Sequence, residues 1–275
     1  MLQTPQIPPG VDPGKPSPAR LYDYYLGGTT NFPADREAAE RIRADLPEIS
    51  DLAWANRGFH QRAARWLADQ RGIRQFIDIG SGLPTQGNTH QVIQNVSRRA
   101  TVVYVDNDPM VLAYASALLT GDGTTAVIHA DLRDPDSVLD NPELRALIDF
   151  SQPIGLLMTA VLHFVADGSD PGGLVDHYVR ALAPGSYLAV SHVTADNVPQ
   201  RGLTTGLAEY AKATENIYLR PRAEVERFFD GVELVAPYEG SEPRLVFLGE
   251  WGAEDPGLAD SDGSRWGYCG VGRVP

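Results

Sequence analysis

The runs Phe76-Ile-Asp-Ile-Gly-Ser-Gly82 and Val102-Val-Tyr-Val-Asp106 carry more structural information than any other part of this chain. Both are short and almost continuously apolar, which is typical of parallel strands that are buried on both faces. Gly80 and Gly82 allow the backbone to turn sharply and to approach a ligand closely. Asp106 ends the second strand, where a carboxylate can accept hydrogen bonds from both hydroxyls of a ribose. The two runs therefore predict an α/β site that binds a nucleoside.

The loop between these two runs bears on which nucleoside is bound. A nicotinamide dinucleotide site has a third small residue three positions after the second glycine, where the pyrophosphate meets the start of a helix. Thr85 holds that position here, and Pro84 lies inside the turn. The longer loop brings fewer amide groups to one anion and suits a ligand with an amino-acid tail. It favours S-adenosylmethionine over a dinucleotide, although a glycine turn alone is a weak signal.

The spacing of strands and acids continues downstream. After a predicted helix at 110–119, residues 125–130 predict a third strand, and Asp131 and Leu132 follow it. There the Asp131 carboxylate can accept from an adenine amino group while Leu132 donates its backbone amide. The alternative is that Asp131 caps a helix before Asp134-Pro135. With a fourth strand at 154–158, the order of elements predicts one doubly wound sheet whose ligand crevice lies at the carboxyl ends of the strands.

Several motifs outside these strands make the chain recognisable. They are Pro18-Ala-Arg-Leu-Tyr-Asp-Tyr-Tyr-Leu-Gly-Gly28, Asn31-Phe-Pro-Ala-Asp-Arg-Glu37, Ala55-Asn-Arg57, Asp78-Ile-Gly-Ser-Gly-Leu-Pro-Thr85, Val105-Asp-Asn-Asp-Pro109, Asp131-Leu-Arg-Asp-Pro135, Ala160-Val-Leu-His-Phe164, Leu182-Ala-Pro-Gly-Ser-Tyr187 and Gly270-Val-Gly-Arg273. From about residue 16 to the C-terminus, the chain resembles an actinobacterial family of S-adenosylmethionine-dependent methyltransferases that was formerly described only as a domain of unknown function. Two positions depart from the family pattern. Thr29-Thr30 replaces a Lys followed by Asp or Asn, and Gln91 replaces a Glu, so polar contacts particular to the family are altered there.

The expected fold class is α/β, with a doubly wound, seven-stranded, Rossmann-like methyltransferase sheet that is mostly parallel. Residues 232–236 and 266–272 are expected to form its antiparallel edge pair. A flexible, proline-rich arm at 1–17 and an N-terminal helical cap at 18–74 precede the methyltransferase domain at 75–275, with which the cap forms one structural unit. Within the cap, apolar residues recur at helical spacing from Leu52 to Leu67 and mark a buried face.

The resemblance implies that S-adenosylmethionine is the cofactor and that S-adenosylhomocysteine is its product. It also implies that Tyr22 and Tyr25 line the pocket; the alternative is that their rings pack the cap on the sheet. Arg57 is a candidate partner of the methionine carboxylate, or else a solvated arginine on a helix face. The candidate cofactor-binding residues are Tyr22, Tyr25, Arg57, Asp78, Gly80, Ser81, Gly82, Asp106, Asn107, Asp131, Leu132 and Ala160.

Methyl transfer from a sulfonium depends mainly on alignment, because the leaving group departs as a neutral thioether. A general base is needed only when the acceptor must lose a proton. His163, which directly follows the fourth strand, is the candidate for this catalytic role. The alternatives are that it orients the cofactor or packs beside Phe164. His192 is a weaker candidate, and the remaining histidines are weaker still, namely His60, His90, His129 and His177.

Composition narrows the classes of partner. The chain has 275 residues, 43% of them apolar, and its formal net charge of −13 disfavours nucleic acid, because phosphate binding uses clustered Lys and Arg. Cys269 is the one cysteine, which leaves no disulfide within the chain, and no metal site is predicted. The N-terminal residues lack the apolar core of a signal peptide, and no apolar run is long enough to span a bilayer. The expectation is a cytoplasmic protein without a membrane partner.

A small-molecule methyl acceptor is the predicted partner. The sequence Asn/Asp-Pro-Pro-Tyr/Phe of methyltransferases that act on nucleic-acid amino groups does not follow the fourth strand, and no Cys-Pro pair for pyrimidine methylation is present. Neither the identity of the acceptor nor the oligomeric state is predicted. Two alternatives stay open: a non-catalytic sensor or scaffold that binds the adenosyl ligands and, less favoured, an NAD(P)-dependent oxidoreductase.

Overall fold

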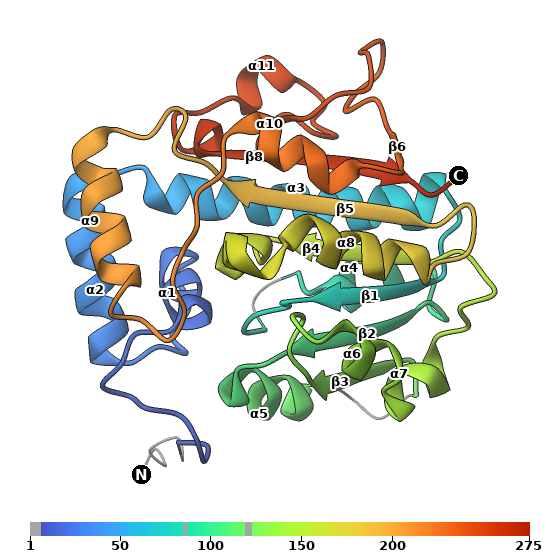
Figure 1. Ribbon diagram of the computed structural model, residues 1–275, viewed down its shortest axis with the longest axis horizontal. Helices are drawn as coiled ribbons and strands as arrows, with labels where there is room; N and C mark the ends of the chain where they lie inside the picture. The colour runs from blue at the N-terminus through green and yellow to red at the C-terminus, as the bar shows by residue number, and fades with distance from the viewer. Residues whose placement is uncertain (1–6, 85–86, 119–122) are drawn as a thin grey trace.

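The computed structural model of the protein describes residues 7–84, 87–118 and 123–275 (Figure 1). Thr85, the third position of the glycine loop, lies outside the described residues, as do Leu119 of a predicted helix and residues 1–6 of the predicted arm. The described residues form a central sheet with helices on both faces. A group of helices from the N-terminal region and from α9 (Gln200–Tyr210) lies across one end of that sheet.

Eight strands form the sheet in the described part of the chain, in the order β3-β2-β1-β4-β5-β8-β6, with β7 also paired to β8. Their bounds are β1 (Gln75–Ile79), β2 (Thr101–Asp106), β3 (Thr125–His129), β4 (Gly155–Thr159), β5 (Tyr187–Val193), β6 (Glu233–Leu234), β7 (Val246–Phe247) and β8 (Gly267–Arg273). The first five strands are parallel to one another, and β8 is antiparallel to β5, β6 and β7. The doubly wound sheet and its antiparallel edge pair are confirmed. The predicted number of seven strands is one too low, because a two-residue strand such as β7 is too short to produce a sequence pattern.

Helices cover both faces of the sheet because successive side chains of each strand point to opposite faces. In β1, Phe76 packs on one face, whereas Ile77 and Ile79 pack on the other. The Phe76 face is covered by α3 (Ile49–Gln70), α4 (Thr89–Gln94) and α5 (Pro109–Leu118), and the opposite face by α6 (Pro135–Leu139), α7 (Pro142–Leu147), α8 (Pro171–Arg180) and α10 (Arg222–Glu226). The same alternation directs Asp78 toward α3 and α4.

The buried face predicted for α3 is confirmed. Phe59, Ala63 and Leu67 are 0% exposed, and the Trp66 ring meets the Trp251 ring edge-on with 5.5 Å between centroids. The opposite side of the helix faces solvent, where Trp54 is 52% exposed. The helix therefore packs directly on β4, β5 and β8.

None of the helices in the described ranges has the length and apolarity that a membrane crossing requires.

A buried ion pair joins the first two helices, α1 (Pro18–Tyr25) and α2 (Pro33–Asp45). Arg20 Nε lies 2.8 Å from Asp35 Oδ2, and the two side chains are 2% and 0% exposed. The same carboxylate accepts the backbone N–H groups of Ser17 at 3.0 Å and Phe32 at 2.8 Å. The Phe32 N–H is held in this way directly before α2, which begins at Pro33. One buried carboxylate thus fixes the start of both helices.

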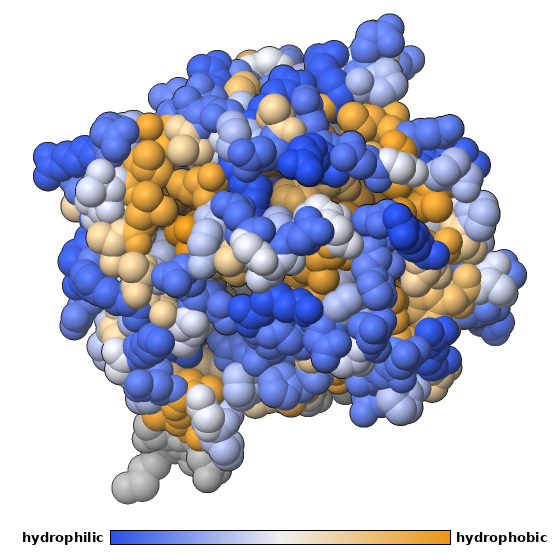
Figure 2. Space-filling view, in the orientation of Figure 1, coloured by the Kyte–Doolittle hydropathy of each residue, from blue (hydrophilic) through white to orange (hydrophobic). Residues whose placement is uncertain are grey.

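Helix α9 packs against α2. Gly202 lies so close to the end of α2 that a Cβ there would overlap the Leu46 side chain. Thr205 Oγ1 also donates to Asp45 Oδ2 at 2.6 Å. These tertiary contacts hold the first half of α9 against α2. Apolar side chains nevertheless gather on the outer surface over this helix (Figure 2), where Leu207 is 41% exposed.

Candidate active site

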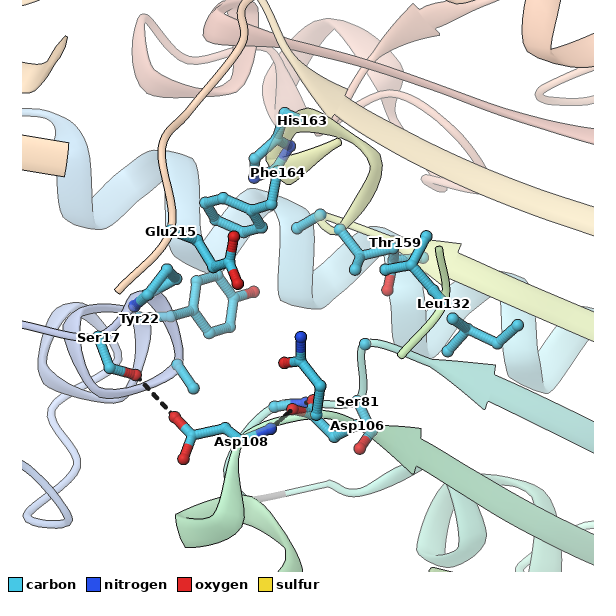
Figure 3. Close-up of a pocket in the computed structure, with 18 of the residues that line it drawn as sticks. Ser17, Tyr22, Ser81, Asp106, Asp108, Leu132, Thr159, His163, Phe164 and Glu215 are labelled. Carbon is cyan, nitrogen blue, oxygen red and sulfur yellow. Dashed lines mark hydrogen bonds between the residues drawn. The ribbon is translucent and has the colours of Figure 1, made fainter. Parts of the chain in front are cut away.

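A cavity of about 340 Å³ lies at the carboxyl ends of the parallel strands, walled by α1, α3 and α9 (Figure 3). The sheet order divides it into two halves. The ends of β3, β2 and β1 border one half, and the ends of β4 and β5 border the other. Every predicted site residue lines this cavity: Tyr22, Tyr25, Arg57, Asp78, Gly80, Ser81, Gly82, Asp106, Asn107, Asp131, Leu132, Ala160 and His163.

The glycine loop after β1 shapes the floor of the first half. Gly80 and Gly82 have φ angles of +69° and +66°, a region that residues with a Cβ rarely adopt. A Cβ on Gly80 would overlap the Val161 side chain, whereas one on Gly82 would meet no heavy atom within 4 Å. Between them, the Ser81 hydroxyl is buried and has no hydrogen-bond partner among the described residues. The loop thus offers a ligand open space and an unused hydroxyl.

Asp106 is held by two backbone groups at the end of β2. The N–H of Gly82 donates to Oδ2 and the N–H of Asp108 donates to Oδ1, each at 2.9 Å. Burial raises the pKa of Asp106 to about 6, and the two N–H groups offset part of that rise. Each carboxylate oxygen has a second lone pair, so the group can also accept two ribose hydroxyls. This geometry is consistent with the prediction that Asp106 accepts hydrogen bonds from both hydroxyls of a ribose.

Asp131 has a partner that the sequence did not indicate. Its carboxylate accepts Nε of Arg133 at 2.9 Å and Nη2 at 2.6 Å, and Nδ2 of Asn107 lies 3.4 Å away. Burial alone would raise the pKa of Asp131, but Arg133 and Asn107 lower it below the ordinary value. The residue whose side chain caps α6 is Asp134, which accepts the N–H of Ser137 at 3.3 Å. The alternative that Asp131 caps this helix is therefore wrong.

A chain of buried hydrogen bonds supports the first half from α3. Thr89 Oγ1 donates to Asp78 Oδ2 at 2.5 Å, so it must accept from His60 Nε2, which is 2.7 Å away. His60 Nδ1 is then the acceptor for Thr159 Oγ1 at 2.9 Å. Burial, followed by the charge of Arg57, lowers the pKa of His60 to about 3, and burial raises the pKa of Asp78 to about 6. His60 is therefore a neutral connector between α3, α4 and β4.

Arg57 lies on α3 beside this chain of bonds and is 9% exposed, so it is not a solvated arginine on a helix face. Its Nη2 donates to Asn88 Oδ1 at 3.4 Å. The positive charge lowers the pKa of both Asp78 and His60. Arg57 is thus a buried cation at the glycine-loop end of the cavity.

A second network ties the cap to the ends of β4 and β5. Ala160 has φ = 53°, a strained value for a residue with a Cβ, and its N–H donates to Ser191 Oγ at 2.9 Å. Ser191 Oγ donates to Asn56 Oδ1 at 2.5 Å, and Asn56 Nδ2 donates to the Tyr22 hydroxyl at 2.8 Å. Tyr22 completes the chain by donating to the backbone carbonyl of Ala53 at 3.0 Å. The Tyr22 ring therefore lines the cavity while its hydroxyl is engaged by protein and not by water.

His163 lies in a short 3₁₀ helix, η1 (Leu162–Phe164), directly after β4. The N–H of Val193 points to its Nδ1 at 3.5 Å, and no hydrogen bond reaches Nε2 from the described residues. Burial, followed by His192 and Arg220, lowers the pKa of His163 well below its ordinary value. The ring is thus neutral, with Nδ1 as acceptor and the proton on Nε2. A histidine in this state donates a hydrogen bond through Nε2, so the geometry does not favour the predicted general base.

His192 and Arg220 hold the loop that carries His163. Arg220 Nη1 donates to His192 Nε2 at 3.0 Å and to the carbonyl of Leu162 at 3.1 Å, while its Nη2 donates to the carbonyl of Val165 at 2.7 Å. His192 Nδ1 therefore carries the proton and donates to the carbonyl of Val193 at 2.7 Å. Burial, followed by Arg220, lowers the pKa of His192 to about 3. His192 is a neutral part of the scaffold, which weakens its candidacy as a base.

Segments from both sides meet over the cavity. Ser17 Oγ donates to Asp108 Oδ2 at 2.9 Å (Figure 3), and the N–H of Thr214 donates to the carbonyl of Pro16 at 2.9 Å. Arg133 donates to both carboxylate oxygens of Glu215 at 3.2 Å. The predicted arm thus supplies part of the cavity wall. Sequence reasoning missed the residues after α9 because they carry no motif.

The sequence matches the model of a family described as S-adenosyl methyltransferase over residues 5–275. Two crystal structures are similar to nearly the whole chain. A duf574 family protein from Streptomyces avermitilis MA-4680 is 41% identical, with 95% of this chain and 98% of that chain covered and a TM-score of 0.87. A Thermobifida fusca YX protein provisionally described as a methyltransferase is 40% identical, with coverages of 98% and 99% and a TM-score of 0.89.

More distant structures share the fold alone. The plantazolicin methyltransferase BamL, in complex with a triazolic desmethylPZN analog and S-adenosylhomocysteine, is 10% identical, with coverages of 94% and 96% and a TM-score of 0.50. A comparison with curated proteins gives no match.

Proposed function

We propose, because the chain belongs to the S-adenosyl methyltransferase family, that it methylates a small organic molecule bound over the carboxyl ends of β4 and β5. The protein is an S-adenosylmethionine-dependent methyltransferase with a Rossmann-like sheet. One observation carries the proposal: the residues expected to hold the nucleoside border the β3-β2-β1 half of the cavity, which leaves the β4-β5 half for an acceptor. The net charge of −13 favours a small molecule over nucleic acid.

The residues of the first half fit the cofactor. Asp106 presents a carboxylate for the ribose, and the unpartnered hydroxyl of Ser81 lies where an amino-acid tail would meet the glycine loop. Gly82 leaves the path open, because no atom lies where its Cβ would be. Arg57 would pair with the methionine carboxylate, while Asp78 would face the ammonium group. When bound, S-adenosylmethionine supplies an electrophilic methyl group on a sulfonium.

In the second half we assign alignment, not proton abstraction, to the protein. Holding the nucleophile in line with the methyl group can lower the barrier by several kcal/mol. His163 would contribute as a neutral donor from Nε2, positioning an acceptor oxygen or nitrogen. The Ala160–Ser191–Asn56–Tyr22 network would hold the end of β4 against the cap during transfer. A nucleophile that needs no deprotonation, such as an uncharged aromatic ring nitrogen, suits this arrangement best.

Calorimetry tests the cofactor half of this proposal. S-adenosylmethionine and S-adenosylhomocysteine are expected to bind one per chain, while NADH and NADPH give no heat. Binding of a dinucleotide in place of the adenosyl ligands would contradict the assignment.

Transfer from methyl-labelled cofactor into small-molecule fractions of a cell extract tests activity. A His163→Ala variant is expected to lose most of this transfer. The matched control is His177→Ala, because His177 is an exposed histidine paired with Asp136 on the surface. Equal transfer by the His163 variant and the native protein would remove His163 from the acceptor site.

Cofactor affinity is expected to fall below about pH 6. Burial raises the pKa of both Asp78 and Asp106 to about 6, so each carboxyl gains a proton below that value in the free protein. A cofactor that donates hydrogen bonds to Asp106 and brings positive charge near Asp78 requires the ionised forms, so binding must release those protons. The dissociation constant should rise by up to about tenfold per pH unit for each carboxyl below pH 6 and stay flat between pH 7 and 8. Calorimetry from pH 5 to 8 measures this, with circular dichroism as the check on folding; a constant affinity over that range would contradict it.

A further inference from the structure

We infer that the β4-β5 half of the cavity accepts an uncharged, planar aromatic molecule. This inference deepens the proposed function and rests on it. The observation behind it is that aromatic side chains from three separate elements surround this half: Tyr22 from α1, Phe164 from η1 and Tyr210 from the end of α9. Sequence separation gives no reason for these rings to meet, so the fold itself assembles the aromatic wall.

The rings contact one another and form one wall of this half. Phe164 and Tyr210 are inclined at 36° with 6.1 Å between ring centroids, so they meet without stacking face to face. Phe164 also meets the His163 ring, with 4.4 Å between centroids. Figure 3 shows Phe164 across the cavity from Asp106 and Asp108, with Tyr22 on the α1 side between them. Aromatic rings packed against a ligand favour offset-stacked or edge-on contact with another ring.

The charges of the cavity lie in its other half or are already paired. Arg57, Asp78 and Asp106 belong to the glycine-loop side, and Arg133 pairs with both Asp131 and Glu215. Apolar side chains also line this half, namely Ile49, Leu52, Val193 and Leu248. The polar side chains Asn56 of α3 and Ser191 of β5 are uncharged and hydrogen-bond to each other. A charged acceptor would leave water for a surface without a counter-ion, which is costly. The lining therefore selects against carboxylates and ammonium groups.

Besides the Ser81 hydroxyl, three polar groups that line the cavity have no hydrogen-bond partner among the described residues. His163 Nε2 and the Tyr210 hydroxyl make no hydrogen bond there, and the buried Tyr25 hydroxyl makes none either. Burial raises the pKa of Tyr210 to about 12, so the phenol remains neutral. Polar groups in an apolar site that have no protein partner are those that a ligand can satisfy, and they fix its orientation. The acceptor should therefore carry at least one ring oxygen, ring nitrogen, carbonyl or amide.

The inference is tested with three probes that share one skeleton, titrated by calorimetry into the full chain saturated with S-adenosylhomocysteine. 2-Naphthamide is planar and uncharged, 2-naphthoate is planar and charged, and the decahydro form of the amide is uncharged but not planar. The amide should bind at least about tenfold more tightly than either of the others, since a charge or a lost aromatic contact costs on the order of 1 kcal/mol or more. Equal or tighter binding of 2-naphthoate or of the decahydro amide would overturn the inference, as would no binding of 2-naphthamide.

Variants locate the probe. Tyr210→Ala is expected to weaken 2-naphthamide about tenfold while the affinity for S-adenosylhomocysteine stays within a factor of two. Tyr24→Ala is the matched control, because Tyr24 lies outside the cavity and its hydroxyl donates to Glu40 on the surface. Unchanged probe affinity in Tyr210→Ala would overturn the inference. The proposed function fails separately, if S-adenosylhomocysteine itself does not bind the native chain.

Discussion

The Asp106→Ala variant is expected to bind S-adenosylhomocysteine at least about a hundredfold more weakly than the native chain. Each hydrogen bond to a charged acceptor contributes about 1.5–3 kcal/mol, and Asp106 has free lone pairs for both ribose hydroxyls. The substitution also leaves the N–H groups of Gly82 and Asp108, which now donate to this carboxylate at 2.9 Å, without a partner. The loop that shapes the ribose site would lose its anchor together with its acceptor.

Calorimetry at pH 8 measures this loss under conditions where the native Asp106 is ionised. Asp176→Ala serves as the control, since that carboxylate pairs with Arg180 on the surface of α8 and does not line the cavity. Thermal unfolding of each variant without ligand provides a separate readout. Burial raises the pKa of Asp106, so its charge is unfavourable in the free fold, and the variant should not unfold at a much lower temperature. A loss of affinity below about threefold would show that the ribose is held elsewhere.

The largest effect on stability is expected from Arg20→Met. This change leaves the Asp35 carboxylate, which is 0% exposed, without its counter-ion. Removing one partner of a buried pair typically costs about 3–5 kcal/mol, because an uncompensated charge stays in the interior. Arg20 also donates to the backbone carbonyls of Asp12 and Lys15, so the segment before α1 would be released as well.

Urea unfolding at pH 7 measures this loss, and Arg180→Met gives the exposed comparison. Arg180 is 78% exposed in its pair with Asp176, so its removal should change the free energy of unfolding by less than about 1 kcal/mol. Asp35→Asn and the double variant complete a double-mutant cycle. The free energies of unfolding lost in the two single variants should together exceed the loss in the double variant by at least about 1 kcal/mol. A loss below about 1.5 kcal/mol in Arg20→Met would mean that solvent reaches the Asp35 carboxylate.

The proposed cofactor half of the site could be predicted because its chemistry is local in sequence. Gly80 follows β1 directly, Gly82 lies two residues further, and Asp106 ends β2. Strands buried on both faces have a distinctive apolar pattern. Once the parallel strands are predicted, no further information is needed to place their carboxyl ends at the same edge of the sheet. The predicted residues therefore come together in one cavity although they lie on five or more separate elements.

The other half could not be predicted, because its residues meet only through tertiary packing. Tyr210 enters the cavity since α9 docks on α2, and that docking depends on Gly202 and Thr205 and not on an apolar repeat. In the β3-β2-β1 half, the pairing of Asp131 with Arg133 was missed for a different reason, because no strand or helix pattern specifies a contact between residues two positions apart. The pKa of His163 is lowered first by burial and then by His192 and Arg220, which lie 29 and 57 positions later, so the sequence alone could not test its predicted role as a base.

The sheet order has a consequence for how this scaffold could acquire new substrates. Because the proposed methyl-donor contacts border β3, β2 and β1 and the proposed acceptor contacts border β4 and β5, substitutions that change one set share few neighbours with the other. Changes at well-separated positions combine almost additively. Leu52, Val193 and Tyr210 can therefore be varied as a library for new acceptors while the methyl donor is retained. In this architecture, the specificity for the acceptor can change without a change in the binding of the methyl donor.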